Sequence, residues 1–316
     1  MRGPVDFHAH LIDPRVYRET QDWSIFAQTT DATRAASVIA RMADVDERIA
    51  AMDAMGVGVQ VLSSSLVHQC SYDAAPDDAR RLDAAMNDTI ARAVAARPDR
   101  FRGLGSVPLQ APDLTVAELT RCIKALGLSG VTISTRVRDR EIGDASLRPF
   151  WEAAEALGAV VFIHPAGNHD TRFRKWQLWN SIGQSFEEAM AIASLFYEGI
   201  LDAYPRLKIV VSHGGGYMPF YLVRIARNYI EKPATRANMS KAPIEYLRML
   251  HYDTCVYDHD SLAHLVDIVG AERIVMGSDY PVGEMTPADF VRDCAALDAA
   301  GREMVLSGNA ERLLKR

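Results

Sequence analysis

The sequence has little cysteine, and none of it is spaced for a disulfide framework. Its four cysteines, Cys70, Cys122, Cys255 and Cys294, are far apart in the chain and form no C-x-x-C pair. This pattern argues against a thiolate zinc site and is typical of reduced thiols in an intracellular enzyme. We expect all four side chains to be small buried hydrophobic residues.

Long apolar runs and basic stripes are also missing. No apolar run approaches the ~18 residues needed to cross a bilayer, and the first expected strand starts near Val5, leaving no room for a signal peptide. The net charge is −6 and the pI about 5.9, without a cluster of lysine and arginine. We therefore expect a cytoplasmic protein with neither nucleic-acid nor membrane partners.

What the sequence does contain is a regular alternation of strand-like and helix-like segments. Short runs rich in β-branched residues recur, and amphipathic stretches such as 77–96, 114–126 and 185–202 separate them. Eight β-α units in 316 residues predict a closed parallel (β/α)8 barrel, that is, a TIM barrel forming one domain over residues 1–316. The expected strands begin near Val5 and at 57–62, 101–107, 131–134, 160–163, 207–211, 252–256 and 273–276.

Two stretches interrupt this alternation. Residues 11 to about 43 follow the first strand, and residues 167–183, with Trp176 and Trp179, follow the fifth. Connections of this length are uncommon unless they have a function, and in a barrel both belong to the C-terminal face. We expect them to be long loops that cover the mouth and wall a pocket.

The first strand ends in the pair His8 and His10. Because strand side chains alternate with period two, both imidazoles are expected on one side of the strand and can bind one metal ion. An H-x-H pair alone is a weak signal, but three later strands also end in a metal-capable residue, namely His164, His213 and Asp279. In a parallel barrel all these strand ends meet at one rim. The alternative is that each is an ordinary hydrogen-bonding residue or, for Asp279, a turn former.

Four motifs, in order, resemble those of the amidohydrolase superfamily. They are His8-Ala9-His10, His164-Pro165, the run from Ser212 to Gly216, and Gly277-Ser278-Asp279-Tyr280-Pro281. More narrowly, the chain resembles the group typified by aminocarboxymuconate semialdehyde decarboxylase. The likeness covers nearly the whole chain, including the segments 179–183, 204–207 and 308–310.

The resemblance implies a mononuclear metal site with one catalytic histidine beside it. In this interpretation His8, His10, His164 and Asp279 bind one divalent ion, while His213 lies close to the water on that ion and transfers protons. Asp279 is then catalytic as well as a ligand, because it orients that water. Three imidazoles and a carboxylate suit Zn²⁺, with Mn²⁺ as the alternative. The fourth strand ends without the lysine that two-metal relatives use.

These features predict a metal-dependent, non-oxidative decarboxylase of an aromatic or unsaturated, muconate-like carboxylic acid. The same site can support a hydrolase or hydratase, because one metal ion can activate water for several reactions. A barrel without catalytic activity that serves as a binding or scaffold protein is a third interpretation. The intact ligand set argues against it.

The resemblance also implies arginines that bind the substrate carboxylate, one of them from a neighbouring subunit. Arg224 matches this position, and Lys232 occupies a further basic position, so a homodimer is expected. In the first loop Ala36 stands where relatives have an arginine, with Arg34 two residues away. Trp176 is expected to contact the substrate. Other polar candidates near the mouth are His169, Arg172, Lys175, Arg136 and Asp253.

Overall fold

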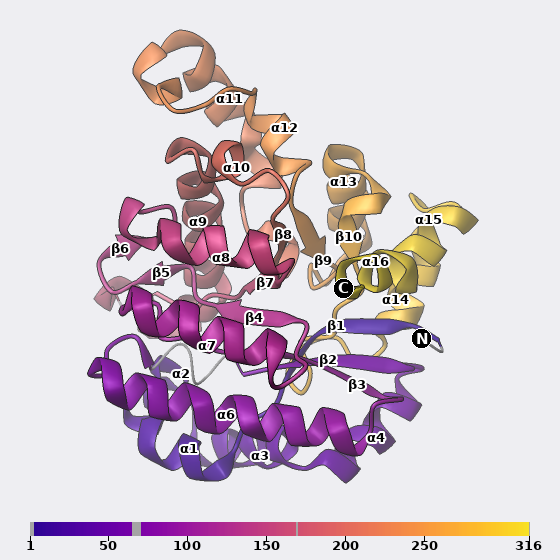
Figure 1. Ribbon diagram of the computed structural model, residues 1–316. Helices are drawn as coiled ribbons and strands as arrows, with labels where there is room; N and C mark the ends of the chain where they lie inside the picture. The colour runs from indigo at the N-terminus through magenta and orange to yellow at the C-terminus, as the bar shows by residue number, and fades with distance from the viewer. Residues whose placement is uncertain (1–2, 65–70, 169, 316) are drawn as a thin grey trace.

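Eight parallel strands form a barrel, as the sequence predicts (Figure 1). The computed structural model describes residues 3–64, 71–168 and 170–315. Backbone hydrogen bonds from Phe7 to Met276 (2.8 Å) and from His10 to Tyr280 (2.9 Å) join the first strand to the segment that begins with the last one. The strands, in hydrogen-bonded order, are β1 (Val5–His10), β2 (Val59–Ser63), β3 (Phe101–Gly105), β4 (Gly130–Ile133), β7 (Val160–Ile163), β8 (Lys208–Val211), β9 (His251–Asp253) and β10 (Ile274–Val275).

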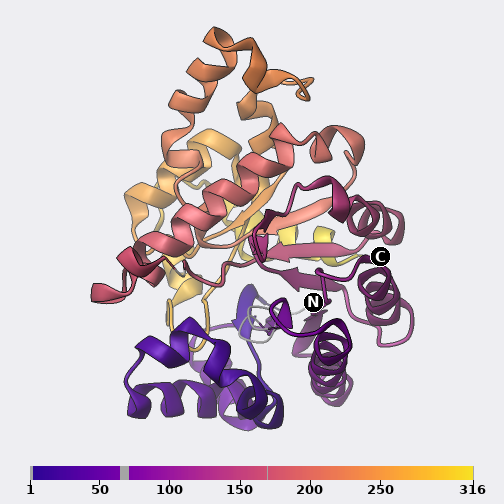
Figure 2. The same cartoon turned by 90° about the vertical axis from the view of Figure 1, so that its left-hand side faces the viewer.

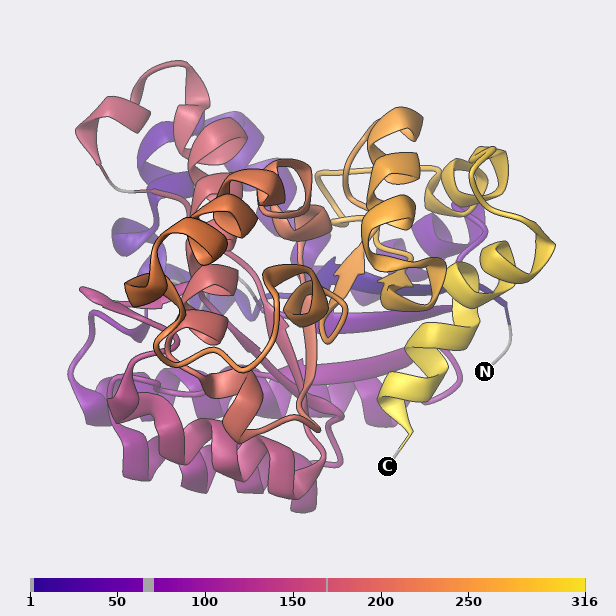
Figure 3. The ribbon, with the colours of Figure 1, turned by 90° about the horizontal axis from the view of Figure 1, so that it is seen from above.

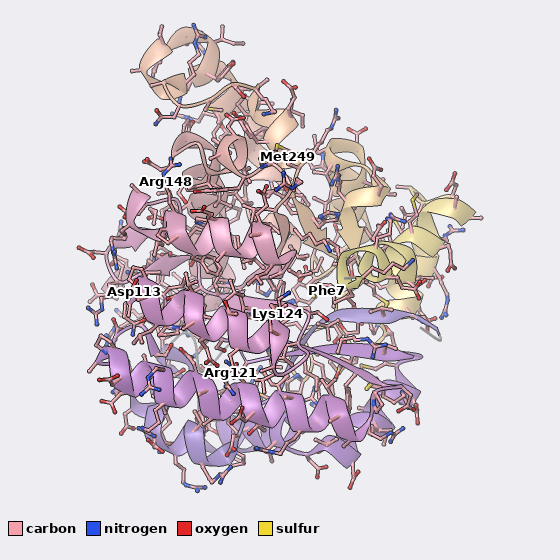
Figure 4. The ribbon with its side chains drawn as sticks, viewed as in Figure 1. Phe7, Asp113, Arg121, Lys124, Arg148 and Met249 are labelled. Atoms are coloured by element: carbon pink, nitrogen blue, oxygen red, sulfur yellow. The ribbon has the colours of Figure 1, made fainter. Side chains whose placement is uncertain are left out.

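Helices cover the outside of the barrel and carry charged side chains such as Asp113 and Lys124 on their outer surface (Figure 4). The main helices are α6 (Pro76–Ala96), α7 (Pro112–Lys124), α8 (Arg148–Leu157), α9 (Ser185–Tyr197), α10 (Ile200–Ala203), α11 (Leu222–Glu231), α12 (Pro243–Leu247), α13 (His259–Val269), α14 (Pro287–Asp293), α15 (Ala299–Glu303) and α16 (Asn309–Leu314). Most of these helices lie where amphipathic segments were expected, whereas α12, α15 and α16 were not predicted and the expected helix 185–202 divides at Gly199, which has a φ of 71°.

The hydrophobic core has two layers. The larger one lies between the strands and the helices, and the smaller one fills the barrel with side chains such as Val61, Phe162 and Val210. Leu313 of α16 joins the inner cluster, and Lys208, at the start of β8, donates to the Leu313 carbonyl (3.1 Å). Helix α16 therefore closes the end of the barrel where the strands begin. The opposite end is left for a site.

An irregularity in β1 brings both metal-capable histidines inside the barrel. The register between β1 and β2 shifts between Asp6 and Ala9. Phe7 belongs to the inner cluster, yet the ring of His8, the next residue, also lies 5.0 Å from the inner Phe162 ring. A bulge resets which side chains face inward, so the strand can pack the barrel with Phe7 and still present its histidines at the rim.

The two long connections surround the C-terminal end of the strands, which faces the viewer in Figure 2. The first is helical rather than an open loop, with α1 (Pro14–Thr20), α2 (Ile25–Thr29), α3 (Ala32–Ala43) and α4 (Val45–Ala54). Side chains of Asp13, Asp31 and Asp44 cap three of these helices by accepting backbone N–H bonds, a signal visible in the sequence.

The second connection protrudes from the molecule, on the side away from the two chain ends (Figure 3). It consists of short turns and a π-helical turn, Trp179–Gln184, that runs directly into α9. A small hairpin of β5 (Arg136–Val137) and β6 (Arg140–Glu141), absent from the sequence prediction, follows β4.

The expectation that the cysteines are buried is confirmed for the three that the structure describes. Cys122, Cys255 and Cys294 are buried free thiols, whereas Cys70 lies outside the described residues. Within the described ranges, no helix combines the length and the apolar character that crossing a membrane requires.

Candidate metal centre

The four predicted ligands meet at the C-terminal rim of the barrel. His8 and His10 come from β1, His164 directly follows β7, and Asp279 follows β10. One ligand atom from each lies within 4.8 Å of the other three, and all four residues are buried. Residues 271 positions apart in the chain are thus brought together by closure of the barrel.

The geometry of this cluster suits a cation. Nε2 of His8 lies 3.2 Å from Nε2 of His10 and 3.2 Å from Oδ1 of Asp279, and His10 Nε2 lies 2.9 Å from the same oxygen. Nδ1 of His8 lies 2.6 Å from the Asp253 carboxylate, and Nδ1 of His164 lies 3.0 Å from the Pro165 carbonyl. Both partners accept hydrogen bonds, so the two Nδ1 atoms carry the protons. The Nε2 lone pairs are then left for a metal ion, the usual arrangement of histidine ligands.

The electrostatics favour a positive charge at this point. Burial disfavours the charged form of His8, but the carboxylates of Asp279 and Asp253 outweigh it and raise the pKa of His8 to about 9. Burial, followed by the charges of His10 and His8, holds the pKa of His164 well below 6.5, so its imidazole is neutral at pH 7. A neutral imidazole beside two carboxylates can hold a divalent ion.

A network of buried hydrogen bonds holds the two strand ends that carry His10 and Asp279. Asp6 accepts hydrogen bonds from the Ser278 backbone (2.9 Å), the Ser278 hydroxyl (2.6 Å) and the Gln60 amide (2.8 Å). Gln60 in turn accepts from Arg48, which is completely buried and also donates to the His10 carbonyl (2.5 Å). These bonds tie β1 and β2 to the residue next to Asp279, and sequence reasoning did not find them.

His213 lies beside the four ligands rather than among them. Its Nε2 is 3.7 Å from Oδ2 of Asp279, and its Nδ1 is 2.6 Å from the carboxylate of Glu188. Burial lowers the pKa of His213, but the carboxylates of Glu188 and Asp279 together outweigh burial and place that pKa well above its usual value. His213 can therefore carry a proton while facing the metal centre.

Three residues around the centre have a positive φ angle, which residues other than glycine rarely adopt. His213, Tyr257 and Asp279 have φ angles of 48°, 59° and 57°. Such conformations cost free energy and persist only where the surrounding structure enforces them. The Tyr257 hydroxyl lies 3.4 Å from Oδ2 of Asp279. Gly283 leaves room for this hydroxyl, because a Cβ at position 283 would lie only 3.1 Å from it.

A pocket of about 1130 Å³ opens above the centre. Its base includes His10, His164, His213 and Asp279, and α2, α3 and the segment before α9 form part of its walls. Arg34 is the one basic side chain among the described residues that line it. The aromatic side chains on its walls are Phe26, Trp179, Tyr217, Phe220 and Tyr257.

The predicted substrate-binding residues lie outside the pocket of their own chain. Arg224 is on the exposed face of α11, and Lys232 directly follows that helix. Trp176 is 82 % exposed at the tip of the protruding segment, whereas Trp179 lines the pocket. Of the other candidates, Asp253 holds His8, Arg172 pairs with Asp170, and His169 lies outside the described residues.

Sequence reasoning missed several polar side chains at the site, among them Glu188, Arg48 and Gln60. A usable signal existed for Glu188, since two adjacent acids open an otherwise apolar helix. None existed for Arg48 of α4 or Gln60 of β2, because nothing in the sequence says which polar residue of a helix or strand turns toward the site.

Comparison with known proteins places the chain in a defined group. A family model described as Amidohydrolase matches residues 5–316. The chain is 36 % identical over 272 residues to a 2-amino-3-carboxymuconate-6-semialdehyde decarboxylase of Dictyostelium discoideum, covering 84 % of this chain and 75 % of that protein.

Solved structures agree over the full length. A 5-carboxyvanillate decarboxylase of Sphingomonas paucimobilis superposes with a TM-score of 0.90 at 29 % identity, over 98 % of each chain. A dihydroxybenzoic acid decarboxylase of Polaromonas sp. JS666, with bound manganese and the inhibitor 2-nitroresorcinol, gives a TM-score of 0.89 at 25 % identity, over 99 % of this chain and 97 % of that one.

Proposed function

The chain belongs to the amidohydrolase family, and from that membership and the geometry of its site we propose that it is a metal-dependent, non-oxidative decarboxylase. Its substrate is an aromatic or unsaturated, muconate-like carboxylic acid. One observation carries the proposal: His8, His10, His164 and Asp279 converge in one cluster, and the last three of them line an aromatic-walled pocket together with Arg34 and His213. The decarboxylase relatives support the choice of reaction.

The three imidazoles and one carboxylate hold a single divalent ion, Zn²⁺ or, as in the Polaromonas structure, Mn²⁺. Such an ion supplies Lewis-acid polarisation of a substrate oxygen and activates water. Asp253 and Pro165 hold the imidazoles of His8 and His164 in the required orientation. Asp6, Gln60 and Arg48 keep the two strand ends in register.

His213 supplies the proton that decarboxylation requires. When the carbon–carbon bond to CO₂ breaks, the electron pair stays on the substrate carbon and takes up one proton. His213 Nε2 faces the pocket while Nδ1 is held by Glu188, so the imidazole can deliver that proton. The second oxygen of Asp279, 3.7 Å from Nε2, keeps the ring directed toward the reacting atoms.

Arg34 is the residue that recognises a second acidic group on the substrate. Its guanidinium lines the pocket, and among the described residues no acidic side chain pairs with it. A free guanidinium can bind a carboxylate or phenolate through two parallel hydrogen bonds. It therefore takes the place of the first-loop arginine that Ala36 does not supply.

Arg224, Lys232 and Trp176 serve the site of a second copy in a homodimer. All three are on or beside exposed segments, and the same or adjoining segments carry exposed apolar side chains, including Ile182, Phe186, Tyr221, Val223 and Ile230. An apolar surface of this kind is typical of an interface between copies. A cytoplasmic location is consistent with the buried free thiols Cys122, Cys255 and Cys294.

The test is to measure carbon dioxide release from a panel of hydroxybenzoates, methoxybenzoates and muconate-like acids. The protein is stripped of metal, reloaded with Zn²⁺ or Mn²⁺, and incubated with each acid in D₂O. We expect one acid to release stoichiometric CO₂ and to give a product with one deuterium on the carbon that lost the carboxylate.

The metal-free protein and the His164→Ala variant serve as controls and should be inactive. If an acid or a lactone is consumed without CO₂ release, the hydrolase or hydratase alternative is correct. If the metal-loaded protein consumes nothing from panels of acids, lactones and amides but still binds them, it is a binding protein.

A further inference from the structure

Helix α9 carries a carboxylate in a position where a charge is costly. Most of the helix is apolar, and its inner face packs into the core through Ala191, Ile192 and Leu195. Glu188 is nevertheless completely buried. A buried carboxylate is retained only where hydrogen bonds or an opposite charge compensate for the loss of water.

The compensation comes from two adjacent residues at the end of β8. The Ser212 hydroxyl donates to Oε1 of Glu188 at 2.5 Å, and Nδ1 of His213 donates to the same oxygen at 2.6 Å. Oε2 has no hydrogen-bond partner among the described residues. Both bonds to the protein therefore act on one oxygen, and one of them orients the imidazole.

The backbone around His213 is built to admit this carboxylate. Gly216 has a φ of 60°, and a Cβ at this position would lie 2.9 Å from Oε2 of Glu188 and 2.2 Å from the Ser185 carbonyl. Only glycine allows α9 to approach so closely. The glycine run after His213 thus has a second consequence besides a tight turn, namely access for Glu188.

We propose that Glu188 is the positioning residue of His213, holding its proton on Nδ1 so that Nε2 faces Asp279 and the substrate pocket. The inference rests on the proposed function for its catalytic consequence, but not for the orientation itself. Because a carboxylate only accepts hydrogen bonds, it fixes the imidazole in one tautomer and one rotation. Glu188 belongs to α9, whereas the four residues of the metal centre belong to β1 or follow β7 and β10. The orientation of His213 therefore does not depend on the position of a metal ligand.

The test compares Glu188→Gln with Glu187→Gln as a matched control. Glu187 precedes Glu188 on the same turn, but its carboxylate contacts Asn168 (2.8 Å) and not His213. Glu188→Gln keeps the size of the side chain, yet its amide can donate to Nδ1 and so favour the wrong tautomer. We expect kcat to fall roughly 10- to 100-fold with KM and metal content unchanged, and the control variant to stay within about threefold of the parent.

A second comparison separates positioning from general destabilisation. In a His213→Ala background, the change Glu188→Gln should lower kcat by less than about twofold, because the residue it positions is already gone. If Glu188→Gln lowers kcat by the same factor with and without His213, or no more than Glu187→Gln does, the proposal is wrong.

Nitrogen-15 NMR of the histidine rings tests the orientation without any substrate. The signal of His213, identified by its loss in His213→Ala, should show a proton on Nδ1 in the parent and lose this pattern in Glu188→Gln. A parent protein with Nδ1 unprotonated overturns the proposal. Should the NMR result hold while no acid is decarboxylated, the proposed function fails and the positioning role of Glu188 stands.

Discussion

His213 and His164 are neighbouring histidines to which we assign different roles at the site. Their ring centroids are 5.2 Å apart, yet His164 belongs to the four-residue cluster and His213 is held outside it by Glu188. We predict that His213→Ala keeps near-stoichiometric metal and loses ~10²–10⁴ of kcat, the usual contribution of general acid–base catalysis. Metal content and turnover are measured on one preparation. If the variant purifies without metal, His213 is a direct ligand. If it keeps full metal and full turnover, His213 has no catalytic role.

The opposite outcome is predicted for His164→Ala. The side chain lies at the rim and not in either hydrophobic cluster, so the barrel should stay folded while metal affinity falls. Elemental analysis and circular dichroism of the purified variant check both parts. His259→Ala, in which an exposed histidine bonded to the Phe290 carbonyl is removed, is the control and should stay metal-loaded. Equal metal in both variants would contradict the ligand assignment.

A histidine far from the rim should make the protein sensitive to acid. Burial, together with the charge of Arg273, lowers the pKa of His251 from 6.5 to about 4. As the pH falls below 6.5, the unfolded chain binds a proton there that the folded chain does not bind until about pH 4. The contribution of His251 to the free energy of unfolding is therefore fully present above pH 6.5. It is lost as the pH falls toward 4, by at most about 3 kcal/mol.

The variant His251→Gln isolates this effect. Urea unfolding of the metal-free parent and variant at pH 7.5, 6 and 5 should show a smaller loss of stability for the variant as the pH falls. Since both proteins retain all the histidines of the metal centre, the difference between them reports His251 alone. Identical pH slopes would mean that His251 titrates normally in the folded state.

At this scale the sequence predicted the four residues that the structure brings together in one metal-capable cluster, and it missed the residues that support them. His8, His10, His164 and Asp279 each end an apolar run, and barrel topology alone sends all strand ends to one rim. Glu188 and Arg48 lie on helices, where the direction of one polar side chain depends on the packing angle of the helix against the barrel. That angle arises from many contacts distant in sequence, so the two adjacent acids that open α9 could mark Glu188 as unusual but could not give its contact with His213.

Among the strands, β4 depends on a single glycine. A Cβ at Gly130 would lie 1.9 Å from the carbonyl oxygen of Val160, its partner on β7. Gly130→Ala should therefore separate the two strands and cost about 3 kcal/mol or more. Gly158→Ala is the matched control, because its φ of 61° is strained for alanine but nothing lies within 4 Å of the added carbon.

The control should cost only about 1 kcal/mol, the price of a left-handed backbone in alanine. The midpoints of urea unfolding and the yield of folded protein compare the two variants. If the two variants were equally stable, the prediction would be wrong. Strands β4 and β7 could then move apart enough to admit the added carbon at little cost.

The elements of the barrel were predictable from the sequence, whereas the first connection was not. Strands such as β7 and β8 are largely apolar on both faces, because helices cover one face and the inner core the other, so their signal in the sequence is strong. The long first loop proved helical. Three aspartate caps marked its helices, but the amphipathic pattern of α4 is weak, and short helices stabilised by packing leave little periodicity.

At the scale of the whole molecule, α9 and the segments around α11 both carry exposed apolar residues. Phe186 and Met190 lie one turn apart on α9, and Tyr217, Phe220 and Tyr221 precede α11. The protruding segment with Trp176 leads into α9 along the chain. Burying this surface against a second copy would bring Arg224 and Trp176 toward that copy's pocket, since the same segments wall the pocket in each chain.

Mixing two inactive variants tests whether the site is shared. We predict that Arg224→Ala and His164→Ala subunits, each inactive as homodimers, regain activity when combined, because the chain with intact His164 receives Arg224 from its partner. A purified heterodimer, selected by two different affinity tags, has one complete site and should show about half of the parent activity. If Arg224 served its own chain instead, both sites of the heterodimer would lack one residue, and it would stay inactive. Subunit exchange without any rescue would therefore place Arg224 outside the partner's site, while a monomer on sedimentation would remove the shared site altogether.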